Sequence, residues 1–240
     1  ILFYLLTCVM VFLALSLLSS HLRGERPSGS HFRVGFFGSL LFAAHPVHVE
    51  AVTWLSARKE VLHGFFFFLA FYLYLVAREK QGWKKILFSV TVLASILMAI
   101  LSKPSAVVFP AVLLIYEMAL GPHRWTDFIK KHRWFFLVSI FLSSVFTFLL
   151  VKVMLDAGGI KAYHGGTFLN NLLVSFYVFL YNIKLLVFTV NYSAAYAVRI
   201  PFPLLDVQTL LVIGIVLLLM AGSLWSLKKT KIFFFSFFFF

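Results

Sequence analysis

The residues best suited to chemistry lie in one short polar stretch, residues 45–60, between two apolar blocks of the chain. It reads His-Pro-Val-His-Val-Glu-Ala-Val-Thr-Trp-Leu-Ser-Ala-Arg-Lys-Glu. Glu50 can act as a general base or a metal ligand, and His45 and His48 can supply imidazoles. Ionisable groups at membrane depth are costly to keep and commonly serve a function. We therefore predict that the catalytic residues are Glu50, His48 and His45.

Pro46 predicts a helix boundary inside this stretch, because proline cannot donate a backbone hydrogen bond and suits a first helical position. From there Val47, Ala51, Trp54, Leu55 and Arg58 recur at helical spacing, which predicts an amphipathic helix lying in the membrane interface. On such a helix His48 and Glu50 lie about 200° apart, so a compact His/His/Glu metal site is not predicted. Ordinary interfacial side chains are the alternative for both histidines.

Three bases stand on the face of the membrane where bases are rare. They are Arg58, Lys59 and Lys103, the last within Ser102-Lys-Pro-Ser105. Cations kept there can neutralise a lipid phosphate at headgroup depth. The alternative is that they extend to ordinary anionic headgroups or pair with Glu60.

The composition predicts an integral membrane protein. Of 240 residues, 62% are hydrophobic and 12% are charged, and the mean hydropathy is +1.00. The net charge of +13 comes from short basic clusters between apolar blocks, which is typical of cytoplasmic loops and not of nucleic-acid binding. The single cysteine, Cys8, excludes a disulfide within the chain. Walker, dinucleotide and Gly-x-Ser-x-Gly motifs are absent, which argues against an ATP-driven pump or a serine hydrolase within this chain.

The hydrophobic blocks predict an all-α polytopic bundle of about seven crossings with added interfacial helices. The predicted crossings are residues 1–20, 34–44 (short), 61–77, 86–101, 105–120, 134–153 and 207–227. With the amino end outside, fourteen of the twenty-one bases lie on the inner face. A crossing by residues 169–190 would move the basic tail outside, so we predict that this segment lies in the outer interface.

Three further expectations concern the ends of the chain and one acid within a predicted crossing. We predict an integral membrane domain over residues 1–231 that lacks its true amino-terminal start, because Ile1 already lies at membrane depth. Residues 232–240 are almost all phenylalanine and are interpreted as a low-complexity end. Glu117, late in a predicted crossing, is expected to pair with a base of a loop.

The polar stretch is also the part of the chain that resembles a known family. The run Leu41-Phe-Ala-Ala-His-Pro-Val-His-Val-Glu-Ala-Val-Thr-Trp-Leu-Ser-Ala-Arg-Lys-Glu-Val-Leu62 resembles a signature of bacterial polytopic proteins with tetratricopeptide repeats. It also resembles the related transmembrane-and-tetratricopeptide-repeat O-mannosyltransferases of animals. Leu101-Ser-Lys-Pro-Ser-Ala-Val-Val-Phe-Pro110 and the segment from Asn171 to Tyr192 resemble further parts of that family.

The resemblance implies a fold of the GT-C glycosyltransferase type and transfer of a sugar, mannose in the animal family. The donor would be a polyprenyl- or dolichyl-phosphate sugar, the acceptor a protein hydroxyl on the outer face. Arg58, Lys59 and Lys103 would then contact the donor phosphate. The expected acid of the first outer loop and the repeat domain are missing, so this piece alone is expected to be inactive. Cofactors are undetermined, with a divalent cation left open, and membrane lipid is the further expected partner. The expected location is the bacterial inner membrane or the endoplasmic reticulum membrane, and a non-catalytic scaffold or transporter is the alternative function.

Overall fold

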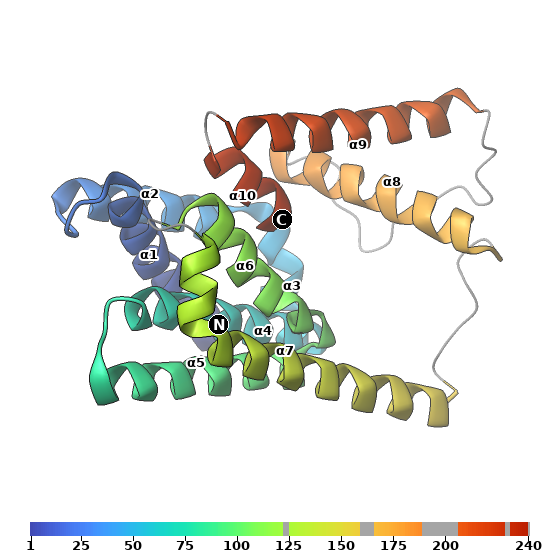
Figure 1. Ribbon diagram of the computed structural model, residues 1–240. Coiled ribbons are helices and arrows are strands. Elements are labelled where there is room, and N and C mark those ends of the chain that lie inside the picture. Colours follow the sequence, from blue (N-terminus) through green and yellow to red (C-terminus); the bar gives the residue numbers. More distant parts are fainter. Residues whose placement is uncertain (122–124, 159–165, 189–205, 229–230, 240) are drawn as a thin grey trace. The chain divides into compact units, whose positions relative to one another are not determined.

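The computed structural model describes residues 1–121, 125–158, 166–188, 206–228 and 231–239, and every regular element in these ranges is helical (Figure 1). This confirms the predicted all-α polytopic fold. In chain order the elements are α1 (Leu2–Arg23), α2 (Gly29–Ala44), η1 (Pro46–His48), α3 (Val49–Thr53), η2 (Leu55–Ala57), α4 (Arg58–Ala77), α5 (Gly82–Ser102), η3 (Pro104–Val108), α6 (Phe109–Ala119), α7 (Trp125–Asp156), α8 (Phe168–Val187), α9 (Val207–Ser226) and α10 (Lys231–Phe239).

Six helices within the described residues are long and apolar enough to cross a membrane, so the protein is an integral membrane protein. They comprise residues 2–23, 58–77, 82–102, 132–156, 168–187 and 209–226. Two predicted crossings are shorter than this: α2 has 16 residues, and residues 105–120 form the 3-10 helix η3 followed by an 11-residue α6. By contrast, α8 reaches spanning length, so its predicted interfacial position remains a prediction.

The chain divides into two compact units, and each is described by itself. Unit 1 contains residues 1–152, that is α1 to α6 with most of α7. Within it α4 packs against both α1 and α5. Phe3 in the first turn of α1 lies 5.5 Å, between ring centroids, from Phe65 in the first half of α4, and His21 in the last turn of α1 reaches Glu79 just after the end of α4. The two helices are therefore parallel, as the predicted alternation of crossings requires.

Glycines allow α2 to lie unusually close to α1. A Cβ atom on Gly35 would lie 2.0 Å from Ser16 Oγ, and one on Gly38 would lie 2.5 Å from a methyl carbon of Leu15. Small residues at such positions let two membrane helices approach until their backbones pack together. The α1–α2 pair thus brings the end of α2, where the polar stretch starts, against the start of α1.

The predicted amphipathic helix from Pro46 to Arg58 is wrong. The segment is three short pieces, η1, α3 and η2, and α3 ends at Trp54, which has an extended backbone (φ −86°, ψ 125°). α3 has only five residues, three of them β-branched, and such side chains lose rotamer freedom in a helix. The helix α4 then begins at Arg58, three residues before the predicted crossing.

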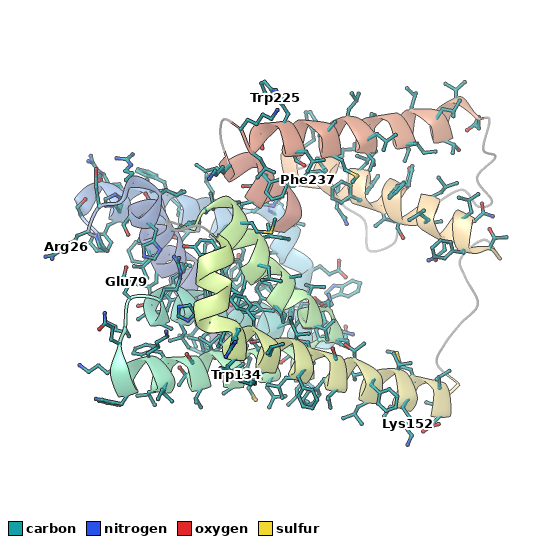
Figure 2. All side chains as sticks on the ribbon, in the orientation of Figure 1. Arg26, Glu79, Trp134, Lys152, Trp225 and Phe237 are labelled. Atoms are coloured by element: carbon teal, nitrogen blue, oxygen red, sulfur yellow. The ribbon has the colours of Figure 1, made fainter. Side chains whose placement is uncertain are left out.

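Unit 2 contains α8, α9 and α10, with α8 packed against α9. The phenylalanine-rich end, which was interpreted as low-complexity sequence, forms the helix α10 in the described residues. Phe237 of α10 lies 5.7 Å, between ring centroids, from Phe179 of α8; Phe237 is labelled in Figure 2. No candidate site residue lies in this unit.

Candidate functional site

One end of unit 1, here called the His45 end, gathers the residues that the sequence singled out. It consists of the start of α1, the end of α2, the pieces η1, α3 and η2, the start of α4, and Lys103 at the end of α5. Tyr4 of α1 donates a hydrogen bond of 2.9 Å to the Ala43 carbonyl at the end of α2. This bond ties the entry of the polar stretch to α1, while its exit becomes the first turn of α4.

Lys103 reaches the same end because α4 and α5 form an antiparallel hairpin. Its Nζ atom lies 2.5 Å from Oε2 of Glu60, which is in the first turn of α4. The two residues are 43 positions apart in the sequence, and the side chains are 37% and 34% exposed. Lys103 therefore lies at the end of the bundle that also carries Arg58. The pairing with Glu60 is the alternative that the sequence left open for these bases.

His45 and His48 are half-buried in an aromatic cluster. The His45 ring accepts a hydrogen bond of 3.2 Å from the Val47 amide, and so caps η1. The His48 ring lies 4.3 Å from the Phe42 ring and 5.8 Å from the Tyr4 ring, measured between centroids. Burial and the nearby His45 lower the pKa of His48, so its ring is neutral at neutral pH. These contacts give both histidines a packing role.

Glu50, Arg58 and Lys59 are all exposed. None of them makes a side-chain hydrogen bond or ion pair with another residue that the structure describes. Glu50 belongs to the short helix α3, whereas both bases belong to the first turn of α4. The acid and the two bases are therefore available to a ligand at the membrane boundary.

The opposite end of unit 1, here called the Arg78 end, holds a buried polar network that the predicted site residues did not include. Arg78 binds Glu117 through two nitrogens, with Nε 2.9 Å from Oε1 and Nη2 3.0 Å from Oε2. Tyr74 donates a hydrogen bond of 2.8 Å to Glu117, and Arg78 donates one of 3.0 Å to the Tyr116 hydroxyl. Exposures of 7% for the Arg78 side chain and 1% for that of Glu117 exclude water from this pair.

The network continues to the surface through His21 of α1. Its Nδ1 lies 3.3 Å from the Tyr116 hydroxyl, and its Nε2 lies 2.8 Å from a carboxylate oxygen of Glu79, in the turn after α4. The expected pairing of Glu117 with a loop base is confirmed, because Arg78 is the first base of that loop. The sequence signal for this network was an acid inside a predicted crossing, but its partners Arg78 and Tyr74 lie 39 and 43 residues away in the sequence.

A groove of about 620 Å³ runs between α6 and α7 within unit 1. Its walls are mostly apolar, and a strip of hydroxyls on α7 comprises Ser143, Ser144 and Thr147. The Ser143 hydroxyl is buried and has no hydrogen-bond partner among the described residues. On this side the groove begins at Val107 of η3, four residues after Lys103, and continues along α6, so it extends away from the His45 end.

Metal coordination finds no support in the described parts of the chain. No group of three or more His, Cys, Asp or Glu side chains there is placed to hold an ion. His45 and His48 have ring centroids 6.2 Å apart and contact each other edge to face. The chemistry that these residues offer is therefore proton transfer, hydrogen bonding and the binding of anions.

Comparison with known proteins gives two related matches. The human protein O-mannosyl-transferase TMTC3 is 37% identical over 85 residues, which is 35% of this chain and 9% of the human protein. The mouse protein O-mannosyl-transferase TMTC3 is 33% identical over 89 residues, 36% of this chain and 9% of the mouse protein. No family model and no solved structure matches the chain. The chain is thus distantly similar, over about a third of its length, to a protein O-mannosyl-transferase, and the match covers about a tenth of that protein's length.

Proposed function

We propose that this chain is part of a membrane glycosyltransferase that moves a sugar, mannose by analogy with the relatives, from a polyprenyl-phosphate donor to a protein hydroxyl. The observation that carries the proposal is the meeting of three cationic residues, Arg58, Lys59 and Lys103, at one end of unit 1. The similarity to a protein O-mannosyl-transferase supplies the reaction class. A fold of the GT-C type and a location in the endoplasmic reticulum or bacterial inner membrane belong to the same proposal.

The start of α4 is suited to a phosphate. A helix amino terminus carries about half a positive charge, from peptide dipoles and free N–H groups. Arg58 and Lys59 are exposed on this first turn and have no carboxylate partner among the described residues, so they add two full charges. A lipid phosphate at headgroup depth would meet these groups together, and a low-dielectric surrounding strengthens the attraction.

The reaction itself breaks the bond between the sugar C1 atom and the phosphate oxygen and forms a bond from C1 to the acceptor oxygen. The acceptor proton passes to a carboxylate base, and the phosphate leaves with one more negative charge than it had in the donor. Cations near the phosphate therefore stabilise the transition state more than the bound donor. Glu50, exposed on α3, is the candidate for orienting the acceptor hydroxyl, and in the segment just before it His48 packs against Phe42, Tyr4 and His45.

The α6–α7 groove offers a place for the hydrocarbon chain of the donor. It starts near Lys103 and is lined mostly by apolar side chains, which suits a long isoprenoid tail. The donor would then bind with its phosphate at the cations of the His45 end and its isoprenoid tail in the α6–α7 groove.

Binding is the direct test, because a chain that covers 9% of its relatives' length need not complete a turnover. The chain, reconstituted in lipid nanodiscs, should bind a fluorescent polyprenyl-phosphate mannose, and Arg58→Ala should weaken this binding about tenfold through loss of one charge-assisted contact. Arg26→Ala is the matched control, because Arg26 is an exposed arginine in the loop after α1, towards the Arg78 end (Figure 2). Equal binding by wild type and both variants, or none by the wild type, would contradict the proposal and leave a scaffold or transporter role.

A further inference from the structure

We propose that Glu60 sets the affinity of the site for phosphate by competing for Lys103, so that the spent lipid phosphate can leave. This inference rests on the proposed function and adds a positioning residue to the same site. It starts from the ion pair between Lys103 Nζ and Glu60 Oε2, which joins the end of α5 to the first turn of α4.

The exposure of this pair shows that it can exchange partners. Both side chains are about one-third exposed, at 37% and 34%. Ion pairs in contact with water contribute about 0–1 kcal/mol, because solvent screens the charges and two flexible side chains must be ordered. A phosphate oxygen arriving at this end can therefore replace the Glu60 carboxylate at little cost.

The buried ion pair of Arg78 and Glu117 in unit 1 provides the contrast. The Arg78–Glu117 pair is almost fully buried, is bound through two nitrogens, and has Tyr74 and Tyr116 as further partners. Burial and several partners are what an ion pair needs in order to hold two helices together, and the pair at the His45 end lacks both. The Glu60–Lys103 pair is instead a single contact that is open to water, and the exposed bases Arg58 and Lys59 precede Glu60 in the same first turn of α4.

Glu60 remains stable as an anion when Lys103 leaves it. It is the third residue of α4, where the positive end of the helix dipole favours a carboxylate. Glu60 can then draw Lys103 back once the ligand has gone.

The negative charge of the lipid phosphate increases during sugar transfer, and the competition between this phosphate and Glu60 for Lys103 affects the release of the product. A sugar-phosphate donor is a phosphodiester with one negative charge. The lipid monophosphate left behind carries about −1.5 to −2 at pH 7. With only Arg58, Lys59 and Lys103, the site would hold this product more tightly than the donor. The carboxylate of Glu60 opposes the more highly charged product most strongly and so favours its release.

The test compares the binding of polyprenyl monophosphate and of polyprenyl-phosphate mannose to the chain in nanodiscs. Glu60→Gln should tighten monophosphate binding about two- to fivefold, the value of one exposed ion pair, and should change donor binding less. Glu60→Asp, which keeps the charge, should bind like wild type. A double variant with Lys103→Gln should lose the gain, because no lysine is then released.

Glu79→Gln is the matched control, since Glu79 is also an exposed glutamate, is paired with His21, and lies at the Arg78 end (Figure 2). A purely structural Glu60 would predict weaker binding and lower stability for Glu60→Gln, never tighter binding. If wild type binds both lipids and Glu60→Gln binds the monophosphate no more tightly, this inference is wrong and the proposed function stands. If wild type binds neither lipid, both are wrong.

Discussion

Removing Glu117 should destabilise unit 1 far more than removing any exposed acid. The Glu117→Leu variant removes the carboxylate that neutralises the Arg78 guanidinium, in a site where the Arg78 side chain is 7% exposed, and the hydrogen bond to the Tyr116 hydroxyl supplies no negative charge in its place. Arginine cannot lose its proton in a protein, so the charge stays buried. Breaking a buried ion pair from one side costs about 3–5 kcal/mol.

The reverse substitution, Arg78→Met, should cost less than Glu117→Leu. The remaining Glu117 can take up a proton and become neutral, and it still accepts the hydrogen bond from Tyr74. Replacing both members together should recover most of the loss, because two apolar side chains of similar volume leave no buried charge. The order of stability should therefore be the double variant above Arg78→Met, and Arg78→Met above Glu117→Leu.

The assay is the free energy of unfolding of the purified chain, measured by titrating mixed micelles with sodium dodecyl sulfate and following tryptophan fluorescence. Lys103→Met serves as the reference, since its exposed ion pair should contribute only about 0–1 kcal/mol. A cost for Glu117→Leu no larger than that of Lys103→Met would show that the buried network does not hold α4 to α6.

Three further results are expected. Burial and His45 lower the pKa of His48, so the contribution of the neutral His48 ring to stability is complete above about pH 6.5 and is lost as the pH falls through the lowered pKa. His48→Phe should flatten that part of a curve of stability against pH. An unchanged curve would contradict the packing role of His48. Single cysteines at Thr167 and Phe188, which flank α8, should both label from the outer side if α8 lies in the interface, and labelling from opposite sides would make α8 a crossing. Ser144→Trp, which fills the α6–α7 groove, should weaken the binding of polyprenyl-phosphate mannose severalfold. Leu149→Trp, an exposed position of α7 that does not line the groove, should leave this binding unchanged. Equal effects of the two variants would remove the groove from the proposal.

The sequence alone determined the fold class, because spans of apolar residues can satisfy their backbone groups in a bilayer only as helices or closed barrels. It also located the polar stretch, since charged residues stand out against so apolar a background. It misjudged the local path from Pro46 to Arg58. Helical spacing of apolar residues is compatible with one helix, and nothing in that spacing reveals the extended backbone of Trp54.

Only the tertiary structure decided which charges meet. Lys103 and Glu60 are 43 residues apart and meet because α4 and α5 form a hairpin. Arg78 and Glu117 are 39 residues apart and meet because α6 returns beside α4. Sequence gives the sign and the rough membrane depth of each charge, but an ion pair depends on which helices are neighbours and on how each is rotated about its axis. Packing sets both of these, through close approaches such as that of Gly35 to Ser16.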